Sequence, residues 1–189
     1  MKIVSHLYPK IASIENLLLA WEEFIKNKKQ KVDVRVFAQH LVQNIFSLNH
    51  DLINFTYKHA FYQRFDINDP KSRIIHKATV RDRVVHHAVY RVLYPIFDKS
   101  FIFDSYSCRI GKGTHKAVKR LEKFTWKVSR NYTKSCWALK CDIKKFFDSV
   151  DHEILFSLIK KKIKDENTLW LIWEIISSFS SKFQRERES

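Results

Sequence analysis

Apolar residues recur every three or four positions in the first third of the chain, which predicts helices. Residues 11–26 carry one such stripe, made of Ile11, Ile14, Leu17, Leu18, Trp21 and Ile25. A charged break with four lysines follows between positions 26 and 31. A second helical stripe then contains Phe37, Leu41, Ile45, Leu48 and Leu52. This pattern predicts a helical N-terminal extension over residues 1–58.

The pattern changes to alternation in YQRFDINDPKSRII, residues 62–75. The turn-forming residues Asn68, Asp69 and Pro70 stand in its middle, so we expect a strand, a tight connection and a second strand. Thr79 is a suitable N-cap for a helix that runs toward Tyr94. Pro95 is expected to limit the far end of that helix.

Short elements are predicted for the rest of the chain. A helix should follow Thr114, and CWALKC, residues 136–141, is typical of a short strand. Asp151 and Asp165 are plausible N-caps for two final helices. Helices dominate and a few strands lie between them, so the expected fold class is α+β.

The charge of the chain indicates a polyanionic partner. Its 35 Lys and Arg outnumber 20 Asp and Glu, giving a formal charge of +15. Nucleic acid is the leading partner, with an anionic membrane surface second and a merely basic surface as the plain alternative.

The apolar runs are too short to span a membrane, and the N-terminus does not resemble a secretory signal. Three cysteines without zinc-type spacing suggest reduced thiols, and we expect a cytoplasmic protein without a membrane partner.

One candidate site surrounds Asp142, directly after the predicted CWALKC strand. Lys140, Lys144 and Lys145 make its surroundings basic. Magnesium binds carboxylate oxygens together with substrate phosphates, so an acid in a phosphate-attracting region suits a Mg²⁺ site. The competing interpretation is a turn or helix-capping residue, which also explains the neighbouring Asp148 and Asp151.

Two further clusters are cationic. The first could clamp a triphosphate, because the arginine fork matches phosphate oxygens, or could be a solvated charged face. It consists of Lys71, Arg73, Lys77, Arg81 and Arg83. The second, in SYSCRIGKGTHKAVKRL, places two glycines before a predicted helix, which allows close approach of a phosphate backbone. Its spacing is not that of a P-loop.

Taken in order, three segments resemble the reverse transcriptases. KSRIIHKATVRDRVVHHAVYRVLYPIF resembles their first fingers motif, FDSYSCRIGKGTHKAVKRL the second, and WALKCDIKKFFDSVDHEIL the palm motif with the first catalytic aspartate. The resemblance covers roughly residues 60 to 180. DRVVHHA, SYSCR and GKGTH are most similar to bacterial enzymes, particularly those of diversity-generating retroelements.

The resemblance implies roles for individual residues. Asp142 would be the catalytic ligand of two Mg²⁺ ions, with the backbone carbonyl of Ile143 beside it. Phe147 would be the steric gate against a ribose 2′-hydroxyl, and Arg73 and Arg81 would meet the incoming deoxynucleoside triphosphate. The residues implied to contact an RNA template and DNA primer, or to brace the fingers, are Arg83, Arg109, Lys112 and Lys116.

The resemblance also implies a right-hand polymerase architecture. Residues 59–135 would form helix-rich fingers and residues 136–182 the start of an incomplete palm. Independently of the resemblance, QRERES has no apolar pattern, so residues 183–189 are expected to be a disordered tail. The family's aromatic-x-Asp-Asp turn does not occur in the sequence. The expected function is therefore the fingers and partial palm of an RNA-directed DNA polymerase. The alternatives are an inactive nucleic-acid-binding protein and one piece of a split polymerase completed by a second chain.

Overall fold

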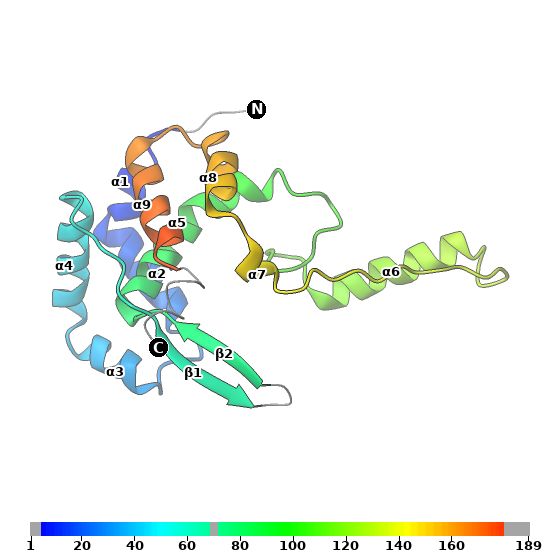
Figure 1. Ribbon diagram of the computed structural model, residues 1–189, viewed down its shortest axis with the longest axis horizontal. Coiled ribbons are helices and arrows are strands. Elements are labelled where there is room, and N and C mark those ends of the chain that lie inside the picture. The colour runs from blue at the N-terminus through cyan, green and yellow to red at the C-terminus, as the bar shows by residue number, and fades with distance from the viewer. Residues whose placement is uncertain (1–4, 69–71, 180–189) are drawn as a thin grey trace. The chain divides into compact units, whose positions relative to one another are not determined.

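The structure is a computed structural model that describes residues 5–68 and 72–179, apart from the side chains of Arg73 and Asp148. The tail expected over residues 183–189 lies outside the residues that the structure describes. It divides into two compact units. The first unit combines the chain up to residue 93 with the part from residue 147 onward, and the second runs from residue 94 to residue 146. Helices predominate, and the sheet of the described residues is a two-stranded one, as expected for α+β (Figure 1).

The N-terminal helices of the first unit are shorter than the sequence pattern predicts. They are α1 (Tyr8–Ala12), α2 (Ile14–Phe24), α3 (Val32–Gln39) and α4 (Leu41–Ile53). The single helix predicted for residues 11–26 is wrong, because Ser13 is extended and its Oγ accepts a hydrogen bond from the Asn16 N–H at 3.2 Å. An N-cap of this kind starts a new helix. The second predicted helix is likewise divided, at His40.

Helix α5 (Val80–Asp98) completes the core of the first unit. The fully buried side chains include Ile11, Leu17, Phe24, Ile45, Leu48, Leu52, Tyr57, Val84, Val85, Ile163 and Leu171. These come from α1, α2, α4, the segment after α4, α5 and the C-terminal part of the chain, so residues far apart in sequence share one core. Pro95 does not end α5 as predicted, because the helix continues to Asp98.

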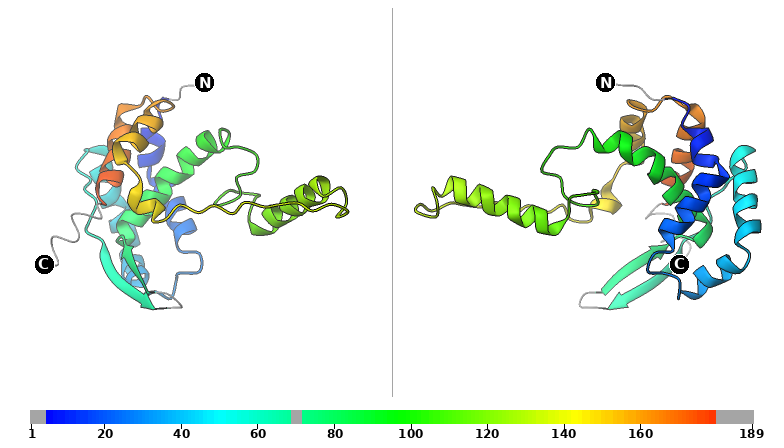
Figure 2. Two further views of the ribbon diagram at one scale, coloured as in Figure 1. Left: turned by 45° about the vertical axis from the view of Figure 1, so that its right-hand side comes forward. Right: turned by 180° about the vertical axis from the view of Figure 1, so that it is seen from behind.

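Strands β1 (Gln63–Asn68) and β2 (Ser72–Lys77) form an antiparallel hairpin. Gln63 pairs with Lys77, and Asn68 pairs with Ser72 next to the turn. This confirms the predicted pair of strands, although the expected turn residues Asp69 and Pro70 lie outside the described residues. The hairpin extends from the helices of its unit in all three views, and every residue of β1 is exposed (Figures 1 and 2).

The C-terminal helices pack back onto the N-terminal ones. They are α7 (Phe146–Ser149), α8 (His152–Lys160) and α9 (Glu166–Ser177). Asp151 caps α8 as predicted, because its carboxylate accepts a hydrogen bond from the Ile154 N–H at 3.0 Å. Asp165 holds the N-cap position of α9, and its Oδ2 accepts from the N–H groups of Leu7 and Tyr8 at 2.7 and 2.8 Å. One carboxylate therefore joins the starts of α1 and α9.

The second unit has no apolar core of its own. Within residues 94–146, all of them described, Ser129 is the buried residue and no apolar side chain is buried. Its helix α6 (Thr114–Val128) exposes Val118, Leu121 and Phe124. The returning segment runs along α6 in the opposite direction in every view (Figures 1 and 2).

The strand predicted over CWALKC does not form. Residues 136–143 are irregular, and Trp137 and Leu139 are 98% and 91% exposed. A strand needs a neighbouring strand for its N–H and C=O groups. Among the described residues, β1 and β2 pair with each other and neither pairs with this segment.

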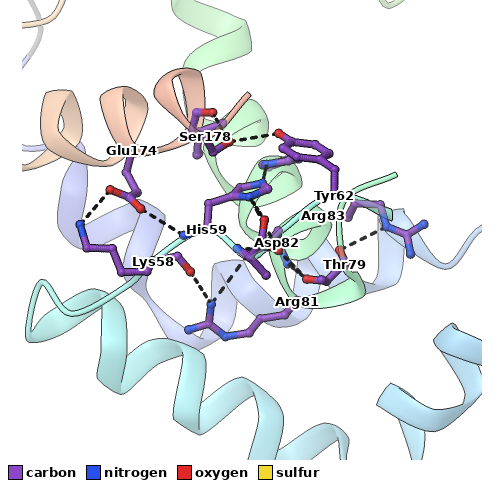
Figure 3. A network of polar contacts seen from close by, with 12 residues as sticks. Lys58, His59, Tyr62, Thr79, Arg81, Asp82, Arg83, Glu174 and Ser178 are labelled. Carbon is purple, nitrogen blue, oxygen red and sulfur yellow. Dashed lines mark hydrogen bonds and ion pairs between the residues drawn. The ribbon is translucent and has the colours of Figure 1, made fainter. Parts of the chain in front are cut away.

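A buried polar network fixes the start of α5 (Figure 3). Thr79 caps the helix as predicted, because its Oγ accepts from the Asp82 N–H at 3.2 Å. The fully buried Asp82 carboxylate accepts hydrogen bonds from the hydroxyls of Tyr57 at 2.8 Å and Thr79 at 2.5 Å. A buried carboxylate is stable only when its oxygens are satisfied in this way. The network therefore holds residues 57–60 against α5.

Two histidines extend this network toward α9. The Nε2 atoms of His59 and His86 lie 3.2 Å apart, and His59 Nδ1 lies 2.6 Å from the Ala60 carbonyl oxygen. Because a carbonyl oxygen can only accept, His59 Nδ1 is the donor in that contact, and the two Nε2 atoms lie within hydrogen-bond distance of each other. The backbone N–H of His59 donates to Glu174 of α9 at 3.1 Å. Burial, and then the neighbouring His59, lower the pKa of His86 to about 4.

Replacing Asp165 with Asn should lower the free energy of unfolding by about 1–2 kcal/mol at neutral pH, because the charge-assisted bonds from Leu7, Tyr8 and Thr168 are weakened. Burial raises the pKa of Asp165, but hydrogen bonds from Tyr8, Thr168 and Leu7 outweigh it, so the pKa lies below its usual range. The difference between wild type and variant should be complete above about pH 4 and shrink as the pH falls below the folded-state pKa. Urea denaturation at several pH values measures it.

Asp151→Asn is the matched control for Asp165→Asn, because asparagine also caps helices and Asp151 bonds only within α8 among the described residues. It should change stability by a few tenths of a kcal/mol. Equal losses in the two variants would contradict the joint between α1 and α9.

The stability of the chain should fall as the pH drops from about 6.5 to about 4. The unfolded chain takes up a proton at His86 near its ordinary pKa, whereas the folded chain does not until about pH 4. This group alone should contribute a loss of about 3 kcal/mol. His86→Gln should flatten the pH dependence of urea denaturation, while the exposed control His115→Gln should retain it. An unchanged slope in His86→Gln would overturn this assignment.

Candidate functional site

Arg81 and Arg83, predicted to contact nucleotide and nucleic acid, lie in the first turn of α5, and both are paired with acids. Arg81 Nη2 lies 2.6 Å from Asp51 Oδ2 of α4, and its guanidinium lies 4.8 Å from the centre of the Tyr57 ring. Arg83 Nη2 lies 2.6 Å from Asp33 Oδ2 of α3. The structure therefore places both arginines on one turn and uses each of them to hold an N-terminal helix.

The arginines help to lower the pKa values of their acid partners. Burial raises the pKa of Asp33, but hydrogen bonds from Lys77 and Arg83 outweigh it, so the pKa lies below its ordinary value. Asp51 shows the same balance, with Arg81 as the main lowering partner. Lys77 Nζ lies 2.7 Å from Asp33, so one carboxylate links α3, the end of β2 and α5. Both carboxylates are therefore charged at neutral pH.

The hairpin carries the other residue predicted to bind the triphosphate, Arg73. Its backbone lies in β2, opposite Ile67. The side chain of Arg73 and the whole of Lys71 lie outside the described residues. The structure thus places the Arg73 backbone on the hairpin directly preceding α5.

Arg109 organises the loop between α5 and α6 in the second unit. Its Nε lies 2.7 Å from Asp98 Oδ1, and its Nη1 donates to the carbonyls of Ile102 at 2.9 Å and Ser105 at 3.2 Å. The hydrogen bond from Arg109 is the main cause that holds the pKa of Asp98 below its usual range. Of the two roles expected for Arg109, the observed contacts are those of a brace.

Lys112 and Lys116 also donate to carbonyls of this loop. Lys112 Nζ lies 2.7 Å from the Phe103 oxygen and 3.7 Å from the centre of the Phe103 ring, and Lys116 Nζ lies 2.5 Å from the Gly111 oxygen. Gly111 and Gly113 have φ angles of +73° and +106°, which side-chain-bearing residues rarely adopt. An added Cβ at either glycine would meet nothing within 4 Å, so their backbone conformation, rather than space, requires glycine.

Asp142 and Ile143 lie in the irregular segment after α6. Asp142 is exposed and has no hydrogen bond or ion pair with any described residue, and Ile143 is 65% exposed. Lys145 has a φ of +52°, an uncommon conformation for a residue with a side chain. Phe147 stands in α7 and is 85% exposed. The side chain of Asp148 lies outside the described residues.

A single carboxylate of this kind supplies part of a metal site. Its hard oxygens suit Mg²⁺, which takes one or two protein carboxylates together with phosphates and water. Across the part of the chain that the structure describes, no three His, Cys, Asp or Glu side chains gather closely enough to hold an ion. Asp142 therefore fits as one ligand of a site whose other protein ligands the described residues do not bring together.

The sequence reasoning missed two sets of residues. One is the set of acids that pair with the arginines of α5, because those partners are 30 or more residues away. The other is a row of exposed lysines on α6, Lys119, Lys123 and Lys127, whose four-residue spacing could have revealed it. Among the described residues, no helix is long and apolar enough to cross a membrane.

Comparisons with known proteins agree with the three motifs. Residues 66–189 match the family model described as "Reverse transcriptase (RNA-dependent DNA polymerase)". Protein YkfC of Escherichia coli (strain K12) is 26% identical over 52% of this chain and 26% of its own length. The group II intron-encoded protein LtrA of Lactococcus lactis subsp. cremoris is 30% identical over 59% of this chain. Nuclear intron maturase 1, mitochondrial, of Arabidopsis thaliana is 29% identical over 54%.

The matched region of these relatives is a minor part of each. This chain covers 26% of YkfC, 17% of LtrA and 13% of the Arabidopsis maturase. The family match, in contrast, includes about two thirds of this chain, from the hairpin onward, and contains Asp142 and both cationic clusters. The chain therefore belongs to the reverse transcriptase family.

Proposed function

We propose that this chain supplies the fingers and the first part of the palm of an RNA-directed DNA polymerase. The observation that carries the proposal is the position of Asp142 within the family match, exposed and without a partner among the described residues. An acid that serves only as a cap or turn residue is normally bonded to a nearby N–H, as Asp151 is. Asp142 is instead available to an external ligand.

Asp142 and the carbonyl of Ile143 would hold Mg²⁺. When bound, the ions would activate the primer 3′-hydroxyl and neutralise the triphosphate during nucleotidyl transfer. Lys140, Lys144 and Lys145 stand around this aspartate in the sequence and attract the phosphates that complete magnesium coordination. The remaining acids of a two-metal site would come from the aromatic-x-Asp-Asp turn of the family, which the sequence does not contain.

The first fingers motif would contact the incoming deoxynucleoside triphosphate through Arg73 and Arg81. Arg81 has 31% of its side chain exposed, so part of its guanidinium remains accessible beside Asp51. Arg83, Arg109, Lys112 and Lys116 would support or contact the RNA template and DNA primer. The internal bonds of Arg109 favour support in its case.

The proposed right-hand polymerase architecture is supported by the same family relationship. The fingers would span residues 59–135 and the start of the palm residues 136–182, after a helical extension over residues 1–58. The exposed apolar residues Trp137 and Leu139 support this division, because a palm sheet would cover them when CWALKC pairs with neighbouring strands. The motif style of DRVVHHA, SYSCR and GKGTH favours the diversity-generating retroelement group within the family.

RNA binding without polymerisation is the second candidate function. The observation that favours it is charge, because residues 94–146 hold thirteen Lys or Arg against four Asp or Glu. Primer extension separates the two candidates. Binding with no extension, even after the rest of the palm is supplied, would favour the second.

The 189-residue chain alone should not extend a primed RNA template with Mg²⁺ or Mn²⁺. Fusion to the remaining palm of a family member should give activity that Asp142→Asn reduces by more than about a hundredfold, because a charge that stabilises the transition state is lost. The control Asp151→Asn should retain activity, since asparagine preserves the cap of α8. Extension by the unfused chain, or an active Asp142→Asn fusion, would contradict the assignment.

Phe147→Ala should relax discrimination against ribonucleotides in the same fusion by about tenfold or more, because an open space beside the sugar admits the 2′-hydroxyl. The ratio of deoxyribonucleotide to ribonucleotide incorporation in single-nucleotide extension measures this effect. Phe146→Ala removes the adjacent ring and is the matched control. A ratio that is the same in wild type and Phe147→Ala would exclude the gate.

A further inference from the structure

The net charge of the chain is concentrated in the second unit. Residues 94–146 carry a net charge of +9 of the total +15, although they make up little more than a quarter of the sequence. Two of their four acids are already used, because Asp98 pairs with Arg109 and Asp104 pairs with Arg120. Most of the lysines of this unit are therefore not neutralised by nearby acids.

Helix α6 arranges a group of these cations in a row. At 3.6 residues per turn, Lys116, Lys119, Arg120, Lys123 and Lys127 lie within an arc of about 100°. Lys116 bonds to Gly111 and Arg120 to Asp104, whereas Lys119, Lys123 and Lys127 are exposed and have no partner among the described residues. Successive members of this lysine row stand four residues apart, a rise of about 6 Å along the helix.

The lysine row is unfavourable for the isolated helix. Like charges four residues apart repel each other and destabilise a helix. Glu122, the acid of α6, is three residues from Lys119 and can offset its charge, but it lies about 100° and 140° around the helix from Lys123 and Lys127. A polyanion would relieve this repulsion, and evenly spaced lysines suit a ligand with a regular series of negative charges.

We propose that the lysine row of α6, Lys119, Lys123 and Lys127, binds the phosphodiester backbone of RNA. The choice of RNA rests on the proposed function, in which RNA is the template. This surface lies outside the residues assigned above to nucleotide, metal or template, and it would contact RNA without reading its sequence, since phosphates carry no base information. An anionic membrane surface would compete for the same row, because α6 also exposes Leu121 and Val128.

The test compares two triple variants of the full chain that remove the same charge. One is Lys119→Gln, Lys123→Gln and Lys127→Gln on α6. The other is Lys26→Gln, Lys29→Gln and Lys31→Gln, at exposed lysines of the first unit that also have no partner among the described residues. Lysine and glutamine have similar helix propensity, so α6 should remain folded, and circular dichroism checks this.

Fluorescence anisotropy with a labelled 30-nucleotide RNA, measured over a salt series, gives the affinity and its salt dependence. The α6 variant should bind at least about tenfold more weakly, and its slope of log K against log salt should be smaller by about two, because three phosphate contacts are lost. The control variant should keep the slope of the wild type. Equal changes in the two variants would mean that net charge alone matters and would overturn the proposal.

Two further ligands identify the partner. Single-stranded DNA of the same sequence should lose affinity in the α6 variant as the RNA does, because the row contacts phosphates that both share, and an unchanged DNA affinity beside a lost RNA affinity would overturn the backbone assignment. Phosphatidylserine vesicles should bind the α6 variant and the control alike, and a loss confined to the α6 variant with unchanged RNA binding would assign the row to membranes. Absence of RNA binding by the wild-type chain would also overturn the proposal.

The polymerase fusion separates this proposal from the proposed function. The α6 variant should retain turnover at saturating template and show a raised template KM, whereas Asp142→Asn loses turnover. An α6 variant with unchanged KM and unchanged RNA affinity would overturn the lysine row and leave the catalytic assignment intact.

Discussion

The ion pairs between α5 and the N-terminal helices hold α5 in place. Asp51 of α4 pairs with Arg81, Asp33 of α3 pairs with Arg83, and Glu23 of α2 pairs with Arg91. Each side chain is partly exposed, so a single pair contributes about 1 kcal/mol or less. Together they fix the rotation and the axial position of α5 relative to α2, α3 and α4. Apolar contacts alone do not determine these two quantities.

In addition to these ion pairs, a buried polar network fixes the start of α5. The carboxylate of Asp82 is fully buried and accepts hydrogen bonds from Tyr57 and Thr79, and the loss of one such partner would leave a charge unsatisfied in a low-dielectric region. His59 extends the contacts to Glu174 of α9. The first unit therefore combines an apolar core with a polar framework that links both ends of the chain.

The second unit differs from the first in its apolar burial and in how many of its charges are paired. It has few acids, no buried apolar side chain and a loop organised by Arg109 and two glycines with positive φ. Acids in the first unit neutralise the arginines of its main helix, while those of the second leave most of its lysines uncompensated. The polar framework therefore lies in the first unit, and the exposed positive charge is concentrated in the second. The lysine row and Asp142 both belong to the second unit.

The sequence by itself determined the elements whose signals are local. Alternation predicted the hairpin, Thr79 and Asp151 were recognised as caps, and the three motifs indicated the family that the comparisons then showed. The predictions from sequence were wrong where two local signals in the same segment favour different structures. Ser13 divides a continuous apolar stripe by capping a new helix, and α5 continues past Pro95 because a proline near a helix end removes little.

Only the tertiary structure decided which charges are already in use. Arg81, Arg83 and Arg109 look alike in the sequence as phosphate ligands, yet each has an internal carboxylate partner, and two of those partners are 30 and 50 residues away. Lys119, Lys123 and Lys127 look like an ordinary solvated helix face, yet none of them forms an ion pair or hydrogen bond with another described residue. CWALKC has the composition of a strand, but a strand also requires a neighbour, and pairing is a property of the assembled sheet rather than of six residues.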